Sequence, residues 1–164
     1  MVRDFSIRSE GPADFAGCRA VNEAAFGGVT ESNLVDDLRR DGDLVVSLVA
    51  EDDNGTVGHI GLSRMVAPPS ALALAPLAVV PDRQGRGIGS ALVRAALKQA
   101  RALDFAIVFV LGDPAFYGRF GFAVDTAAPF TSPYAGPHFM AAWLGETTMP
   151  PQAVTYAAAF SEVE

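Results

Sequence analysis

The stretch at residues 74–103 reads LAPLAVVPDRQGRGIGSALVRAALKQARAL and decides the fold. Residues 77–80 form a short apolar run that Pro81 ends, which is typical of a strand. After the glycines, apolar residues recur at helical spacing from Ile88 to Leu103. The pattern predicts a strand, a Gly-rich turn and a helix.

The turn, residues 84–89 (QGRGIG), lacks side chains at three of its six positions, so a bound group can approach the backbone closely. The unpaired N–H groups and the positive dipole end of the following helix favour an anion, with phosphate as the usual ligand. A dinucleotide motif fails because Ser90 or Leu92 would occupy its last glycine position. An ATP/GTP loop fails because the only lysine, Lys98, lies inside the helix.

Two motifs carry a resemblance to a known superfamily. Gln84, Gly87 and Gly89 match Gln/Arg-x-x-Gly-x-Gly/Ala, which resembles the loop that binds the pyrophosphate of acetyl-CoA in GNAT acetyltransferases. Residues 112–122, GDPAFYGRFGF, resemble the Tyr-x-x-x-Gly-Phe segment that closes a GNAT core. The full segment resembles the corresponding segment in the YhbS-like subgroup of predicted acetyltransferases.

This resemblance implies a single α/β (α+β) domain over residues 1–164, with a mixed, mainly antiparallel sheet that splays in a V and is flanked by helices. It implies an N-acetyltransferase that moves the acetyl group of acetyl-CoA to a primary amine by direct attack in a ternary complex. Two alternatives stay open. One is an enzyme that transfers longer acyl groups or acylates hydroxyls, and the other is a non-catalytic acyl-CoA-binding sensor or assembly module.

The resemblance also implies which residues bind acetyl-CoA. The backbone of the strand before the turn would pair with the pantetheine arm, the turn would hold the pyrophosphate, and residues of the second motif would complete the site. Asp113 stands where many relatives have an asparagine. The implied residues are Leu77, Ala78, Val79, Gln84, Gly85, Arg86, Gly87, Ile88, Gly89, Ser90, Asp113, Phe116 and Tyr117.

Tyr117 is the implied general acid for the departing CoA thiolate, and packing among neighbouring phenylalanines is its alternative role. Many GNAT enzymes carry an acidic base on the strand before the loop, but residues 71–80 contain none. Glu31 is therefore the candidate base, with a water relay as an alternative. A glutamate that simply stabilises the dipole at a helix N-terminus is a further alternative.

The rest of the chain predicts alternating strands and helices. Thr30 is expected to cap the second helix, and Pro76 is expected to cause a bulge or splay in its strand. The predicted strands are 5–8, 44–50, 56–62, 71–80, 106–111, one that begins at 122–124, and 139–144. The predicted helices begin at 11–14, at Thr30 and at the Gly-rich turn, and a short helix that bears Tyr117 follows the turn at 112–114.

Composition narrows the class of protein. No apolar run reaches the roughly 20 residues of a membrane span, and residues 1–8 carry early charges without a leader-like apolar core, so a cytoplasmic protein is expected. A net charge of −7 disfavours nucleic-acid binding and suits an amine acceptor, on a small molecule or a protein. The aromatic C-terminal segment could complete the core, line the acceptor pocket or form a homodimer contact.

The reactive side chains are few. Cys18 is the only cysteine, which excludes an internal disulfide, and its place in an amphipathic helix predicts an inert buried thiol. The two histidines, His59 and His138, lie far apart in sequence and do not form a metal-ligand spacing. The sequence therefore assigns no metal.

Overall fold

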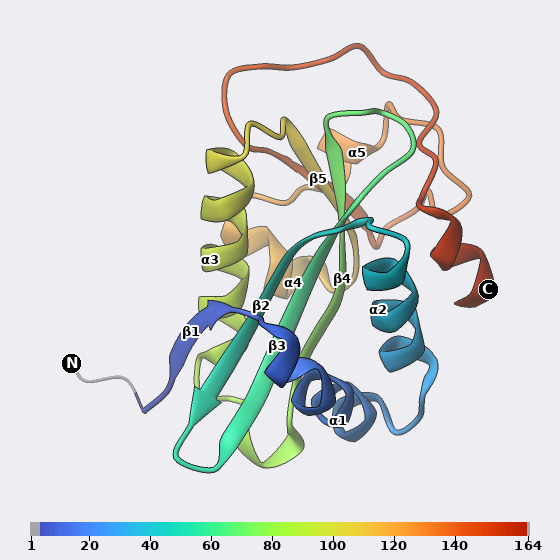
Figure 1. Ribbon diagram of the computed structural model, residues 1–164. Helices are drawn as coiled ribbons and strands as arrows, with labels where there is room; N and C mark the ends of the chain where they lie inside the picture. The colour runs from blue at the N-terminus through green and yellow to red at the C-terminus, as the bar shows by residue number, and fades with distance from the viewer. Residues whose placement is uncertain (1–3, 164) are drawn as a thin grey trace.

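A computed structural model describes residues 4–163, which form one six-stranded sheet with the strands in chain order (Figure 1). Neighbouring strands are antiparallel except the parallel pair β4 and β5, so the predicted mixed, mainly antiparallel sheet is confirmed. The strands are β1 (Ser6–Ser9), β2 (Leu44–Asp52), β3 (Gly55–Arg64), β4 (Ala71–Val79), β5 (Ile107–Leu111) and β6 (Phe139–Trp143).

Helices cover both faces of the sheet. The helices α1 (Phe15–Phe26) and α2 (Thr30–Arg40) pack against each other on one face, and α3 (Ile88–Ala102) packs on the other (Figure 1). Two short helices follow β5, namely α4 (Pro114–Tyr117) and α5 (Val124–Ala127). The 3₁₀ helices are η1 (Pro12–Asp14), η2 (Pro81–Arg83), η3 (Gly118–Phe120) and η4 (Ala158–Val163).

The sheet separates two hydrophobic cores, and β5 contributes to both. Because successive side chains of a strand point to opposite faces, Val108 and Val110 pack with α3 while Ile107 and Phe109 pack with α2. These four side chains are at most 2% exposed, which confirms the predicted strand buried on both faces.

The strand before the Gly-rich turn splits away from its neighbour. β4 pairs with β3 as far as Val79, but with β5 only from Ala71 to Leu74. The register between β3 and β4 shifts opposite Pro76, which confirms the predicted bulge. Within residues 4–163, the edge of β4 that faces β5 therefore has no strand partner beyond Leu74, and the sheet opens there in a V.

Two predictions about local structure are wrong. No strand begins at 122–124, because Ala123 alone pairs with Ala141 of β6 before the chain turns into α5. Thr30 does not cap α2, because Val29 occupies the N-cap and Thr30 is already helical. Glu31 still lies in the first turn of α2, as predicted.

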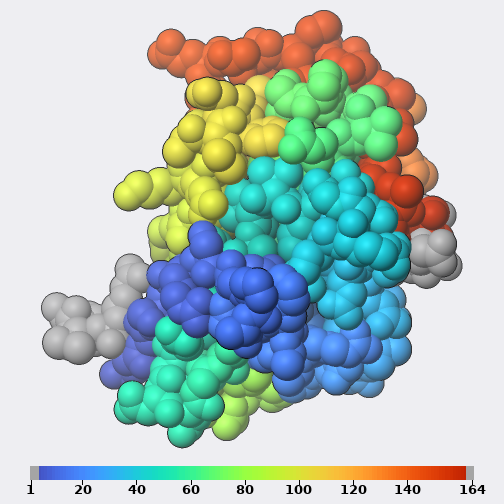
Figure 2. Space-filling view, viewed as in Figure 1, coloured from blue at the N-terminus to red at the C-terminus, as the bar shows by residue number. Residues whose placement is uncertain are grey.

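The C-terminal segment folds back over the face that carries α2. Phe130 and Phe160 are buried in the core on that face, and η4 contacts α2 directly. In Figure 2 the red C-terminal part of this segment lies beside α2, which is cyan. Among residues 4–163, no helix is both long and apolar enough to cross a bilayer. Residues 1–3, part of the leader prediction, lie outside the described residues.

Candidate functional site

A cavity of about 510 Å³, here called the loop cavity, lies where β4 runs into α3. Most of the residues that the sequence assigned to acetyl-CoA surround it. Two arginines that the sequence did not assign, Arg83 and Arg119, also line it. The predicted residues that line it are Leu77, Val79, Gln84, Gly85, Gly87, Ile88, Gly89, Ser90 and Phe116.

The loop depends on glycine at two positions. Gly85 and Gly87 have φ angles of +78° and +85°, a conformation that other residues rarely adopt. Gly87 is also the N-cap of α3, so the first N–H groups of a 15-residue helix open beside the cavity. Gln84 donates a hydrogen bond from Nε2 to the Val79 carbonyl oxygen at 3.0 Å, which ties the loop to the end of β4. The result is a backbone site suited to an anion.

Arg119 supplies a cation to this cavity. Its NH2 group donates to Ser90 Oγ at 3.1 Å, and its guanidinium lies 5.0 Å from the Phe116 ring centroid. The charge of Arg83 is instead balanced by Asp52 and Asp82, at 2.8 and 2.9 Å. Sequence reasoning missed Arg119, although its place inside the 112–122 motif was a usable signal.

Three of the assigned residues do not line the loop cavity with the others. Ala78 is buried in β4 opposite His59, and Arg86 is exposed. Asp113 caps α4, because its Oδ1 accepts a hydrogen bond from the Ala115 N–H at 2.9 Å. A fourth, Tyr117, lines a different cavity.

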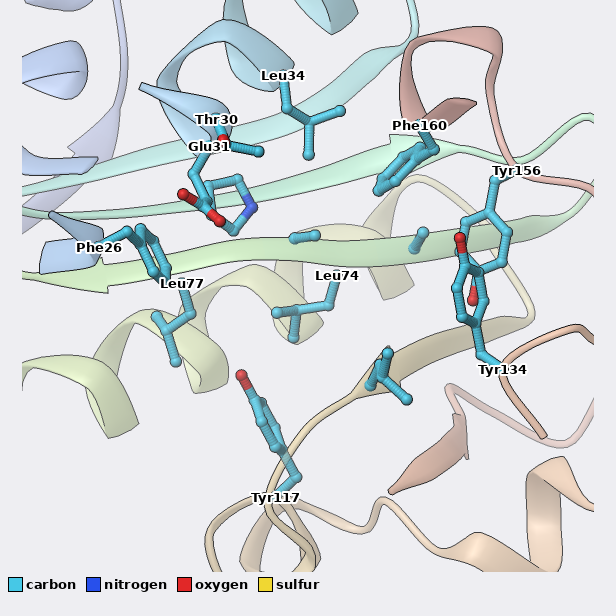
Figure 3. A pocket seen from close by; sticks show the side chains of 14 residues that line it. Phe26, Thr30, Glu31, Leu34, Leu74, Leu77, Tyr117, Tyr134, Tyr156 and Phe160 are labelled. Carbon is cyan, nitrogen blue, oxygen red and sulfur yellow. The ribbon is translucent and has the colours of Figure 1, made fainter. Parts of the chain in front are cut away.

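This second cavity, here called the tyrosine cavity, has a volume of about 440 Å³ and is lined by 14 residues (Figure 3). The structure brings Glu31 of α2 and Tyr117 of α4 to its surface, although they are distant in sequence. Leu77 lines both cavities. The two cavities therefore adjoin at the splayed end of β4.

Tyr117 is held by aromatic packing with its hydroxyl in the cavity. Its ring makes edge contacts with Phe116 and Phe122, at centroid distances of 4.9 and 5.7 Å. A Cβ atom on residue 112 would lie only 2.5 Å from Tyr117 Cε2. The ring can therefore occupy this position only because Gly112 has no side chain. Burial raises the pKa of Tyr117 to about 12, so the hydroxyl is protonated at neutral pH.

Glu31 is the second polar group of this cavity. It is partly buried, and none of the hydrogen bonds or ion pairs found within residues 4–163 involves its carboxylate. The other residues that line the cavity carry no lysine, arginine, histidine or further carboxylate. An unpaired carboxylate at a ligand-sized cavity is available to a bound cation or to a proton.

The C-terminal segment supplies the far side of the cavity as an aromatic wall of Tyr134, Tyr156 and Phe160. Tyr134 and Tyr156 meet edge to face at a centroid distance of 5.3 Å, and Tyr156 and Phe160 lie 5.2 Å apart. The structure shows this segment completing the core and lining the tyrosine cavity. Its aromatic content was the signal, but the sequence could not say where those rings would lie.

A buried polar cluster lies apart from both cavities. Glu10, Cys18 and His59 have ligand atoms within 4.8 Å of one another, which the sequence spacing did not predict. Glu10 accepts hydrogen bonds from Arg39 and Ser47, and Ser47 also bonds to His59 Nε2 at 2.8 Å. Burial raises the pKa of the Cys18 thiol to about 12 and lowers the pKa of His59 to about 4. The predicted buried thiol is confirmed, and it is protonated at neutral pH.

Comparisons with known proteins agree with this geometry. Residues 43–124 match the acetyltransferase (GNAT) domain. The uncharacterized N-acetyltransferase YhbS of Escherichia coli strain K12 is 41% identical over 120 residues, which cover 71% of this chain and 72% of YhbS.

Two crystal structures are similar over nearly the whole chain. That of YhbS from Escherichia coli in complex with CoA has a TM-score of 0.89 and 32% identity, and the match covers 98% of this chain and 94% of that one. That of a GNAT family acetyltransferase from Brucella melitensis with acetyl-CoA has a TM-score of 0.81 and 37% identity, covering 95% and 97%. The predicted fold and the resemblance to YhbS are confirmed. The chain belongs to the GNAT family of acetyltransferases.

Proposed function

We propose that this protein transfers the acetyl group of acetyl-CoA to a primary amine, with both substrates bound at once to a single domain. The observation that carries the proposal is the shared boundary of the two cavities at Leu77. One cavity has the backbone of an anion site, and the other has an unpaired carboxylate and a protonated tyrosine. The relatives crystallised with CoA and acetyl-CoA support acetyl-CoA as the donor.

The loop cavity fits the nucleotide end of acetyl-CoA. The first N–H groups of α3, together with Arg119, would hold the pyrophosphate. The unpaired edge of β4 beyond Leu74 would bind the pantetheine arm as an added strand. A molecule bound in this way would present its thioester near Leu77, between the two cavities.

The amine must lose a proton to attack. An alkylamine of ordinary pKa near 10.4 would cost about 4.6 kcal/mol to present as the neutral form at pH 7. Glu31 lines the acceptor side and would bind the ammonium and accept its proton, directly or through water. The amine nitrogen then forms its bond to the acetyl carbon, and the carbon–sulfur bond breaks with its electron pair on sulfur.

Tyr117 would give the sulfur its proton. With its pKa at about 12, transfer to a thiolate of pKa near 8.5 is uphill by about 5 kcal/mol. That cost fits inside the barrier of roughly 16 kcal/mol of a reaction that turns over about ten times per second. The nitrogen loses its second proton to water as the amide forms, and solvent then returns a proton to Tyr117 and takes the one held by Glu31.

Direct attack, without an acetylated enzyme intermediate, is supported by the position of the only cysteine. Cys18 is 1% exposed, and within the described structure it lines neither cavity. Burial and the nearby Glu10 charge raise its pKa to about 12, which opposes formation of a nucleophilic thiolate.

The test is Tyr117→Phe, which removes the hydroxyl and keeps the ring. We expect turnover to fall about 10²-fold or more while acetyl-CoA affinity, measured by calorimetry, stays within about threefold. Tyr156→Phe is the matched control, because it removes a hydroxyl from the far wall of the same cavity and should cost far less. Unchanged turnover in Tyr117→Phe would remove Tyr117 from the mechanism. A wild-type protein that binds acetyl-CoA but acetylates no amine would instead indicate a non-catalytic acyl-CoA-binding module.

A further inference from the structure

The lining of the tyrosine cavity includes one acidic side chain and no basic one. Among the 14 lining residues, all within the described structure, Glu31 is the only one with an acidic side chain, and none is a lysine, an arginine or a histidine. An acceptor with a carboxylate would bring a second anion to a cavity without a cation to pair it. An acceptor with a single ammonium group would complement Glu31.

The opposite end of the cavity is aromatic. All three tyrosines of the sequence line this cavity, and two of them stand with Phe160 in the aromatic wall. Figure 3 shows Glu31 and Leu77 toward one end of the view and Tyr134 and Tyr156 at the other. A flat apolar group would pack against these rings, whereas a second ammonium there would have no lining carboxylate as a partner.

The size of the cavity suits a small molecule. Its volume of about 440 Å³ falls within the roughly 300–1,000 Å³ typical of small-molecule pockets. Phe26 and Leu111 also line it and are 45% and 53% exposed, so apolar surface continues to its rim. No part of the lining carries the several acidic side chains that a polycation would need.

From charge, shape and lining together, we propose that the acceptor is an arylalkylamine, a primary amine joined by a short chain to an uncharged aromatic ring. This inference rests on the transfer reaction proposed above. Glu31 binds the ammonium end beside the thioester, and Tyr134, Tyr156 and Phe160 contact the ring. The aromatic wall determines which amines bind, whereas the proton transfers by Glu31 and Tyr117 are the same for every amine.

The first experiment is a panel of acceptors assayed by release of the CoA thiol. Phenethylamine is compared with 2-cyclohexylethylamine, which is apolar but not flat, with L-phenylalanine, which adds a carboxylate, and with putrescine, which adds a second ammonium. A short peptide with a free amino terminus represents protein acceptors. We expect kcat/KM for phenethylamine to exceed that for each of the others at least tenfold. A preference for the amino acid, the diamine or the peptide would overturn the assignment.

Variants locate the selectivity in the wall. Tyr156→Leu keeps an apolar side chain but removes the ring, and it should lower kcat/KM for phenethylamine about tenfold. The kcat/KM for propylamine, which has no ring to contact the wall, should change less than twofold. Glu31→Gln should lower kcat/KM for both amines by a similar factor. Acetyl-CoA affinity, measured on each variant, reports whether the fold is intact. Equal losses for the two amines in Tyr156→Leu would contradict the role of the wall.

A binding measurement separates this inference from the transfer reaction. Wild-type protein saturated with CoA is titrated with phenethylamine and with L-phenylalanine by calorimetry, where no acetyl group is present. Tighter binding of phenethylamine supports the acceptor class even if no acetylation occurs, in which case the transfer proposal alone fails. Acetylation of another amine with no binding of phenethylamine would keep the transfer proposal and overturn the acceptor class.

Discussion

Gly112→Ala probes how the fold places Tyr117. The added Cβ would lie 2.5 Å from Tyr117 Cε2 and 3.0 Å from Cδ2, whereas carbon atoms in contact prefer about 3.5–4.0 Å. The ring must therefore move by about 1 Å, and its hydroxyl moves with it. A displacement of that size at a reacting group can cost about 10²-fold in rate. We expect turnover of Gly112→Ala to fall by that factor, with the affinity for acetyl-CoA changed much less.

Gly118→Ala is the matched control. Gly118 follows Tyr117 directly, has a helical φ of −57°, and has no atom within 4 Å of a built Cβ. Its substitution should leave turnover within about twofold and could raise the free energy of unfolding by about 0.4–1 kcal/mol. Thermal unfolding of both variants checks that Gly112→Ala remains folded, because overpacking alone costs about 1–3 kcal/mol.

A double-mutant cycle decides whether the loss acts through the tyrosine hydroxyl. In a Tyr117→Phe background the hydroxyl is already gone, so Gly112→Ala should cost little further turnover. Steady-state thiol release with saturating acetyl-CoA measures all four proteins. Wild-type turnover in Gly112→Ala, or a loss that is as large with phenylalanine at position 117 as with tyrosine, would show that Gly112 does not act through the Tyr117 hydroxyl.

Two further predictions concern the loop and the buried histidine. Gly87→Asp places a negative charge at the N-cap of α3 and should weaken acetyl-CoA binding about tenfold or more relative to Gly87→Asn. Asparagine is the control because it tolerates the same left-handed φ of +85° and carries no charge. Equal affinities of the two variants in calorimetry would mean that no anion binds at this helix end. Because burial holds the pKa of His59 at about 4, below its ordinary 6.5, the unfolded chain protonates first and stability is lost as pH falls from 6.5 toward 4. Urea unfolding should show a loss of about 2 kcal/mol between pH 7 and pH 5, reduced in His59→Gln; an identical pH slope in that variant would exclude His59 as its source.

Local patterns predicted the parts of the site that depend on neighbouring residues. The loop needs glycine because residues 85 and 87 adopt positive φ angles, and a glycine at such a position is visible in the sequence itself. The bulge was predictable from Pro76, since proline removes a strand hydrogen bond. Both features were predicted without any knowledge of distant contacts.

Features that depend on the folding of distant segments were predicted incompletely or not at all. The three apolar residues at 122–124 were too few to separate a strand from the single bridge that Ala123 makes. The aromatic wall forms only when the C-terminal segment folds over α2, so composition could not place Tyr134 and Tyr156. The approach of Glu10 to His59 likewise crosses 49 positions of sequence and has no local signal.

Transfer of the acetyl group from acetyl-CoA to an amine can be followed with an isotope label. The protein is incubated with acetyl-CoA labelled with carbon-13 in its acetyl group and with phenethylamine, and thiol release and labelled N-acetyl product are measured at several concentrations of each substrate. We expect one labelled amide for each thiol released, with initial-rate lines that intersect as they do for a ternary complex. Thiol release without a labelled amide, or parallel rate lines that indicate an acetylated enzyme, would contradict this expectation.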